Sequence, residues 1–314
     1  MTIAIPRQDE WMNRGKVLGP GPVRSWDHRL YGMVTPRIFK FGHHYALFYI
    51  GADGDRVDWD DTGPRHRALG VALSTDGVHF NKHPYNPVYR FSTLDDPHLN
   101  QEEGIFSMAG YEKNGKLMMY VTTTIAESAQ HPSNVHGAIR LLELDYESVI
   151  DRGVVLSYQT PWLYGKGDEI SVYGTFKWGP FRVLLYRCSD GKSIDWHLGA
   201  AVGVGSNWFF MSKAIFPFGA WIGGGDSVKL GDDRYVFLQR GSDINATDET
   251  TEVRKVQGRT LAPSGIRYTF KFGQNRQRHQ TVMLDEENDR WLMYYQLRRE
   301  NWIGLRTAPV RRVA

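Results

Sequence analysis

The strongest constraint on the fold is a two-strand pattern that occurs five times along the chain. Each copy has an acidic or polar start, a first strand, a turn containing Gly or Asp, and a second strand rich in Tyr and aliphatic residues. The copies span residues 35–49, 104–120, 170–186, 226–238 and 280–295. Helical periodicity is almost absent between them. The chain must therefore bury its apolar residues by packing small antiparallel sheets against one another.

The spacing of the copies predicts a repeated-sheet architecture. They recur at intervals of roughly 50 to 70 residues, which is enough for about four strands with loop insertions. We therefore expect an all-β fold, a five-bladed β-propeller with antiparallel four-stranded blades. The charged segment 241–259 is poor in apolar residues and is interpreted as a long loop within or after the fourth blade. No segment differs enough in composition to be a second domain, so residues 1–314 are expected to form one propeller.

Composition excludes some classes of function. The chain has 38 Lys and Arg against 35 Asp and Glu, a net charge of +3. This excess is too small to predict nucleic-acid or membrane binding. Cys188 is the one cysteine, so no disulfide can form within the chain. Residues 1–11 are polar, and no apolar run approaches the length of a membrane span. These features favour a cytoplasmic protein.

Two stretches resemble a known superfamily. One is Ala-Leu-Gly-Val-Ala-Leu-Ser-Thr-Asp-Gly-Val-His-Phe at 68–80, and the other is Ser-Trp-Asp at 25–27 followed by Thr-Pro at 35–36 and an apolar hairpin ending in Tyr-Ile-Gly at 49–51. Both are similar to segments of five-bladed propeller glycosidases, which include glycoside hydrolase families 43, 32, 68, 117 and 130. The resemblance in blade pattern covers about the whole chain and identifies the superfamily better than the family.

The resemblance implies where the reactive groups lie. In these relatives the reactive carboxylates sit where the innermost strands begin, around one mouth of the central channel. The corresponding positions here are Asp27 on a loop before the first strand, Glu102 and Glu103, Asp168 and Glu169, Asp226, and the basic pair Arg278 and His279. Such a ring of acidic residues and one basic pair, at the starts of the first strands, is not expected from turn chemistry alone.

Glycosidic cleavage usually needs one carboxylic acid to protonate the leaving oxygen and one carboxylate to activate water or attack carbon. The acid needs a raised pKa, which a like-charged neighbour supplies. Glu103 is the predicted general acid, because it aligns with the acid of family 130 and with the second-blade carboxylate of family 43. Asp27 is the predicted base or nucleophile, since Thr35 stands where family 43 would place an Asp. A solvated loop pair at 102–103 and a turn role for Asp27 are the alternatives.

Further carboxylates complete the predicted catalytic set. Glu169 or Asp168 resembles the third-blade Glu of family 43, and we expect one of the two to face the channel and the other to be a loop charge. Asp226 follows three glycines, which permit close approach of the backbone to a ligand or to the adjacent blade. It is predicted as a site residue beside Asp27, Glu103 and Glu169.

Basic and aromatic residues are predicted to bind substrate, together with Glu102 and Asp168. Arg278, His279 and Arg37 could hold a hydroxyl, a carboxylate or a phosphate, because Arg recognises planar anions through paired donors. A plain basic loop around Arg278 is the alternative. Trp26 could stack on a sugar ring or belong to the core.

The predicted function is glycoside hydrolysis of an oligosaccharide, with exo action. One alternative is a phosphorylase like family 130, although the Glu-Asp-Pro-Arg of that family is Glu-Glu-Gly-Ile at 102–105 here. A non-catalytic carbohydrate-binding or protein-binding propeller is the other. No cofactor is predicted, and no His, Cys and carboxylate set has the spacing of a zinc site. The sugar, the linkage and the oligomeric state are left open by the sequence.

Overall fold

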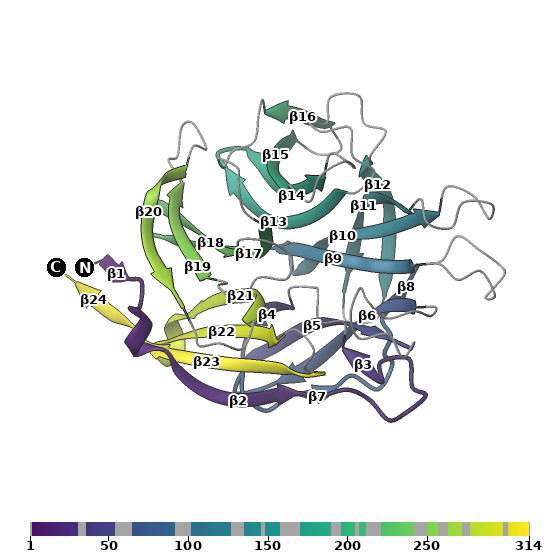
Figure 1. Cartoon of the computed structure of the whole chain (residues 1–314), viewed down its shortest axis with the longest axis horizontal. Helices are drawn as coiled ribbons and strands as arrows, with labels where there is room; N and C mark the ends of the chain where they lie inside the picture. Colours follow the sequence, from purple (N-terminus) through teal and green to yellow (C-terminus); the bar gives the residue numbers. More distant parts are fainter. Residues whose placement is uncertain are drawn as a thin grey trace.

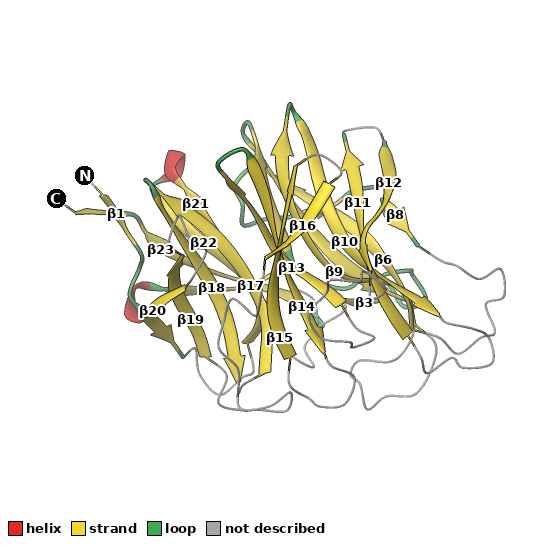
Figure 2. Cartoon of the chain, turned by 90° about the horizontal axis from the view of Figure 1, so that it is seen from above, coloured by secondary structure: helices red, strands yellow, loops and turns green. Residues whose placement is uncertain are grey.

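The computed structural model describes residues 2–30, 36–53, 65–91, 102–126, 135–145, 148–157, 170–189, 196–204, 207–211, 221–241, 250–256, 263–271, 277–297 and 301–313. These stretches are almost entirely β-strand (Figures 1 and 2). Within them, the helical elements are two 3₁₀ turns, η1 (Gln8–Glu10) and η2 (Glu286–Asn288). No helix in this part of the chain is long and apolar enough to cross a membrane.

Three sheets have four antiparallel strands each. Two of them follow chain order, and the third takes its outermost strand, β2, from the N-terminal region. The strands are β13 (Ile170–Trp178), β14 (Phe181–Ser189), β15 (Trp196–Val204) and β16 (Asn207–Met211); β17 (Trp221–Leu230), β18 (Asp233–Gly241), β19 (Thr250–Val256) and β20 (Pro263–Phe270); and β21 (Gln277–Asp285), β22 (Arg290–Leu297), β23 (Ile303–Pro309) and β2 (Met12–Leu18). The prediction of antiparallel four-stranded sheets is confirmed for these three. The interpretation of 241–259 as a long loop is wrong for Thr250–Val256, which form β19 between β18 and β20 and bury Thr251 and Val253.

The remaining large sheet has ten strands and combines two of the predicted repeats. Its strands are β3 (Arg29–Leu30), β4 (Arg37–Phe41), β5 (His44–Ala52), β6 (Arg65–Ser74), β7 (Asn81–Lys82) and β8 (Tyr89–Arg90), then β9 (Glu102–Lys113), β10 (Lys116–Ala126), β11 (Val135–Leu144) and β12 (Val149–Ser157). The two groups join where β6 pairs in parallel with β9. Gly104 allows this join, because its φ is +105° and a Cβ there would lie 2.2 Å from the Arg67 carbonyl oxygen.

The first strands of the five repeats form a closed ring. β4 contacts β9, β9 contacts β13, β13 contacts β17, β17 contacts β21, and β21 returns to β4. Because β6 and β9 merge two repeats into one sheet, the number of separate blades stays a prediction. The chain closes the ring near its own ends: β2 pairs with β23, and β1 (Thr2–Ala4) pairs with β24 (Arg311–Val313), which places both termini together (Figure 1).

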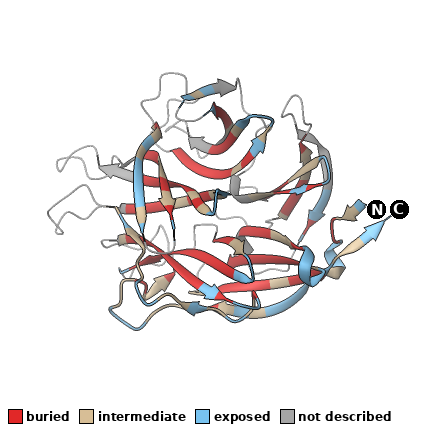
Figure 3. Cartoon of the chain, turned by 180° about the vertical axis from the view of Figure 1, so that it is seen from behind, coloured by how far each residue is buried: buried red, intermediate tan, exposed pale blue. Residues whose placement is uncertain are grey.

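The core lies in the interfaces between neighbouring repeats, here called seams. Each seam is filled by a cluster of buried apolar side chains, and Figure 3 shows the buried segments along the middle of the strands. β14 illustrates the cause. Val183 and Leu185 pack toward the β17–β20 sheet, whereas Leu184 and Tyr186 pack toward β10 and β11. Side chains alternate between the faces of a strand, so a sheet stacked on both sides needs apolar residues at consecutive positions.

Candidate functional site

Arg37 lies at the centre of the ring. It is the first residue of β4 and is buried. Its Nε donates a hydrogen bond to the Met108 carbonyl oxygen on β9 (2.7 Å), and its Nη2 donates to the Tyr173 carbonyl oxygen on β13 (2.6 Å). Its Nη1 lies 3.3 Å from Oδ2 of Asp226 on β17. The planar guanidinium has enough donors to connect these four innermost strands at once.

Asp226 connects the fifth innermost strand to this group. Its Oδ2 accepts hydrogen bonds from the Thr281 hydroxyl and from the Val282 N–H (3.1 Å), both on β21. Its Oδ1 accepts from the Ser227 N–H at 2.8 Å. We call Arg37 and Asp226 the central ion pair. The structure thus brings two predicted site residues together, in an arrangement in which both are already hydrogen-bonded and 22% of the Asp226 side chain remains exposed.

The innermost strands all run in the same direction along the axis of the ring. β6 pairs in parallel with β9 and, like β4, antiparallel with β5, so β4 and β9 agree. Lys40 at the end of β4 binds Asp285 at the end of β21. Arg182, just after the β13–β14 turn, lies over the ring of Tyr111 near the end of β9, and the β13–β14 and β17–β18 turns line one pocket. The ring therefore has a start end, where these strands begin, and a turn end, where their hairpin turns lie.

Glu102 and Glu103 lie at the start end. They are the first residues of β9, and their backbones pair with Arg65 and His66. Glu103 precedes Met108 by five residues, so its backbone is about 16 Å from the level of the central ion pair at the rise of an extended strand. The contacts of the two glutamate side chains lie outside the described part of the structure.

Two other predicted residues, Arg278 and His279, also lie toward the start end. Arg278 and His279 belong to β21 and precede Thr281 of the central group, with a register shift between Arg278 and Thr281. The described part does not include their side chains. Asp168 and Glu169 lie outside the described residues, directly before β13 in the sequence.

Asp27 lies away from the ring axis. It is buried, and Lys82 on β7 donates to its Oδ2 at 2.6 Å, as does the Tyr49 hydroxyl on β5 at 3.0 Å. Ser25 donates to Oδ1 at 3.0 Å. Burial, together with the charge of Asp27, raises the pKa of Tyr49 and keeps that hydroxyl protonated as a donor. These contacts suit a carboxylate that ties β5 to β7.

Trp26 packs in the same region. Its ring is stacked on Tyr49, with centroids 5.8 Å apart and planes at 26°. A Cβ on Gly51 would lie 2.5 Å from the Trp26 ring, and a Cβ on Gly70 would lie 2.6 Å from it. The indole therefore covers two glycines of β5 and β6, which explains why these strands carry glycine there.

The described residues contain no group of three or more His, Cys, Asp or Glu side chains placed to hold a metal ion. Sequence reasoning also missed a set of cations at the turn end, Lys177, Arg182, Lys229 and Arg234. The signal was present, because each hairpin carries a Lys before its turn and an Arg after it.

No protein-family model matches the sequence, and no curated protein matches it either. Solved structures do share its fold. A glycosyl hydrolase from Bacteroides ovatus superimposes with a TM-score of 0.67 at 12% identity, covering 95% of this chain and 92% of that one. A second structure comes from work on the GH130 family of mannoside phosphorylases, described as containing glycoside hydrolases that target β-1,2-mannosidic linkages in Candida mannan. It gives a TM-score of 0.66 at 12% identity and covers 98% of this chain and 96% of that chain.

A third similar structure is the GH32 β-fructofuranosidase BmSUC1 of Bombyx mori, with a TM-score of 0.63 and 14% identity. The match covers 97% of this chain and 64% of that one. The chain therefore has the β-propeller fold found in glycoside hydrolase structures, and the fold class expected from the repeats is confirmed. At these identities the likeness concerns the fold.

Proposed function

We propose that this protein is a glycoside hydrolase whose oligosaccharide substrate binds at the start end of the ring. One observation supports the proposal: the innermost strands run in a common direction, so the first residues of β9, Glu102 and Glu103, and the basic pair of β21, Arg278 and His279, belong to the same end of the ring. The central ion pair lies deeper along the axis. Because both of its residues are already hydrogen-bonded to the innermost strands, we expect the pair to form a rigid base of the site beneath the substrate.

Glu103 acts as the general acid in this proposal. It donates its proton to the glycosidic oxygen as the bond to the anomeric carbon breaks. Glu169 or Asp168 is the partner carboxylate, which removes a proton from the attacking water or attacks the anomeric carbon itself. Asp27 is less suited to this role, because both of its oxygens already accept hydrogen bonds from Ser25, Tyr49 and Lys82. Exo action remains part of the proposal.

A screen of aryl glycosides and oligosaccharides, furanosides included, tests the hydrolase. Glu103→Gln is expected to lower kcat/KM by at least about 100-fold, because a positioned general acid contributes typically 10²–10⁴-fold. Glu102→Gln is the matched comparison, since it removes the adjacent carboxylate on the same strand; because Glu102 is predicted to bind substrate, this variant should raise KM and leave most of kcat, whereas Glu103→Gln should lower kcat. Equal losses of kcat in both variants, with unchanged melting temperatures, would contradict the assignment of Glu103.

A phosphorylase is the second candidate function, favoured by the position of Arg278 and His279 at the start of β21. In that reaction phosphate attacks the anomeric carbon in place of water, and the two basic residues bind the anion. The same screen with and without inorganic phosphate separates the two. Turnover that requires phosphate and is lost in Arg278→Gln supports the phosphorylase, whereas turnover independent of phosphate supports the hydrolase.

A further inference from the structure

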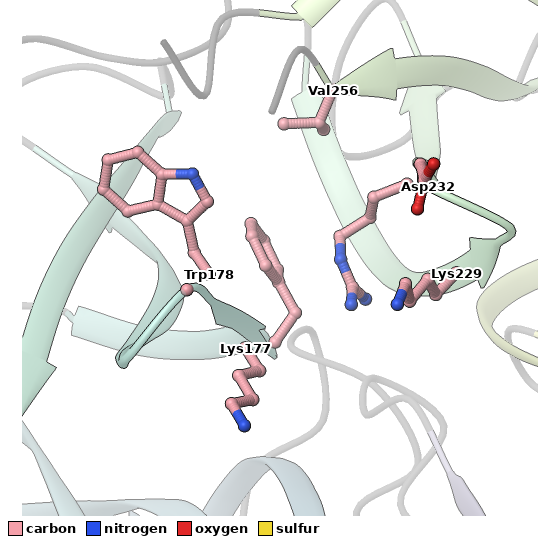
Figure 4. Close-up of a pocket in the computed structure, with 8 residues that line it drawn as sticks. Lys177, Trp178, Lys229, Asp232 and Val256 are labelled. Atoms are coloured by element: carbon pink, nitrogen blue, oxygen red, sulfur yellow. The ribbon is translucent and has the colours of Figure 1, made fainter. Parts of the chain in front are cut away.

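A pocket of about 270 Å³ opens at the turn end, on the opposite side of the central ion pair from the proposed reaction (Figure 4). We call it the seam pocket, because it lies between the β13–β14 hairpin and the β17–β18 hairpin. Phe176, Trp178 and Val256 supply apolar walls, and Lys177, Lys229 and Arg234 supply cations. Figure 4 shows Trp178 and Lys177 on one side of the pocket, with Lys229 and Asp232 on the other.

The charges of the two hairpins are arranged alike. Lys177 on β13 lies directly opposite Arg182 on β14, and Lys229 on β17 lies directly opposite Arg234 on β18. Like charges at directly opposed positions of antiparallel strands are destabilising. The fold therefore carries the same unfavourable pair twice, at the same place in consecutive repeats.

No carboxylate within the described residues forms an ion pair with Lys177, Lys229 or Arg234. Among the described residues that line the pocket, Asp232 is the one acidic residue, and it forms no ion pair with these cations. The described lining residues therefore comprise three cations and one carboxylate, and their net charge is positive.

Arg234 is the most buried of these cations. Its guanidinium lies 4.6 Å from the centre of the Phe176 ring, and its Nη1 donates to the Ser227 hydroxyl at 3.2 Å. Burial, and then the charge of Arg182, lower the pKa of Arg234 to about 10, and Asp226 offsets part of this. A partly buried guanidinium that lacks a carboxylate partner is stabilised by any anion that can reach it.

We propose that the seam pocket binds a phosphate dianion, either free or as the phosphate group of a small sugar ester. The guanidinium of Arg234 and the ammonium of Lys229 would hold the phosphate oxygens by charge-assisted hydrogen bonds. The pocket has room beside them for a sugar, whose apolar face would pack on the Trp178 ring. This is a second ligand site, independent of the proposed reaction at the start end.

Isothermal titration calorimetry on the full chain tests the proposal, with inorganic phosphate, glucose 6-phosphate, glucose 1-phosphate and glucose as probes at constant ionic strength. Phosphate or an ester should bind, and glucose should not. Tighter binding of an ester would identify a sugar phosphate as the ligand, and tighter binding of inorganic phosphate would identify the free ion. Binding of none of the phosphates would overturn the proposal.

Variants locate the binding. Lys229→Gln and Arg234→Gln should each weaken phosphate binding by about tenfold or more, since a hydrogen bond to a charged group contributes about 1.5–3 kcal/mol. Lys229 is exposed, so its variant is expected to fold even where Arg234→Gln does not. Lys255→Gln is the matched control, because Lys255 lies near the same end and is already paired with Asp233 at 2.6 Å. Binding that is lost in Arg278→Gln but retained in Lys229→Gln would place the phosphate at the start end and overturn the proposal.

Discussion

At the turn end, the seam between β21 and β4 and the seam between β13 and β17 both carry cationic side chains, yet their charge balance differs. In the first, the buried Asp285 accepts hydrogen bonds from Lys40 Nζ (2.7 Å), the Tyr45 hydroxyl (2.6 Å), Asn288 Nδ2 (2.9 Å) and Arg290 Nε (2.9 Å). In the second, the described residues give Lys229 and Arg234 no such carboxylate.

The difference follows from what each seam must do. The β21–β4 seam joins the last repeat to the first, so its contacts keep the ring closed. A buried carboxylate with four donors suits this role, because it holds two sheets at a fixed distance and angle. The β13–β17 seam joins repeats that are already consecutive in the chain. It can therefore tolerate an unbalanced positive charge. Charge that costs stability in this way is a common feature of binding sites.

Loss of the Asp285 carboxylate in the β21–β4 seam is expected to have the largest effect on stability. Asp285→Ala should lower the free energy of unfolding by about 3–5 kcal/mol, because Lys40 and Arg290 would be left without their buried partner. Urea denaturation measures the change. Asp232→Asn, at the β13–β17 seam, is the matched control and should change the free energy of unfolding by less than about 0.5 kcal/mol. A similar loss in both variants would remove the distinction between the seams.

The β21–β4 seam should also make the protein sensitive to acid. Burial opposes ionisation of Asp285, but the hydrogen bonds from Lys40, Tyr45, Arg290 and Asn288 outweigh it and lower its pKa to about 2. Ionised Asp285 therefore contributes about 2 kcal/mol above pH ~4, and this contribution is lost as the pH falls toward 2. The stability difference between wild type and Asp285→Asn, measured in urea from pH 6 to pH 2, should shrink across that window. A difference independent of pH would contradict this account.

A carboxylate placed in the β13–β17 seam should make its charge balance resemble that of the β21–β4 seam. Lys177→Glu puts an acid directly opposite Arg182, and it should raise the free energy of unfolding by about 0.5 kcal/mol, within the range of cross-strand ion pairs. It should also weaken phosphate binding. Lys177→Gln separates the removal of a cation from the addition of an anion, and an unchanged affinity for phosphate in Lys177→Glu would count against the seam pocket.

The smallest expected effect comes from relieving one like-charge pair. Lys229→Gln should stabilise the protein by a few tenths of a kcal/mol, because it removes the repulsion toward Arg234. Lys255→Gln should instead lower stability slightly, since it breaks the ion pair with Asp233. Thermal unfolding of the two variants side by side resolves the sign, and a destabilised Lys229→Gln would show that the pair is not repulsive.

The hairpins could be predicted from sequence because their signals are local. Strands flanking a turn of two to four residues, as in 104–120 and 170–186, reveal themselves by composition and by Gly at the turn. The parallel pairing of β6 with β9 could not be predicted, because it joins residues 65–67 to residues 102–104 across a long segment. Nothing in the local pattern of either strand reports such a partner.

The site residues also differ in whether their placement depends on local sequence or on long-range packing. That Glu102, Glu103, Arg278 and His279 fall at the starts of innermost strands followed from the repeat pattern. The partners of Asp27 and Asp226 did not, because Lys82 and Arg37 are distant in sequence and are brought close only by packing of the sheets. The opposed cations of the two hairpins are local, and the register of a short hairpin would have been enough to predict them.

The pairing of β2 with β23 has a consequence for synthesis. A ribosome makes Met12–Leu18 long before Ile303–Pro309, so β2 waits for its neighbour until the repeats between them have been made. During that time both edges of β2 present unpaired N–H and C=O groups, which is the state in which strands pair with the wrong partner. Lys16 and Arg14 lie on this strand, and charges of that kind discourage such pairing while the nascent chain is incomplete.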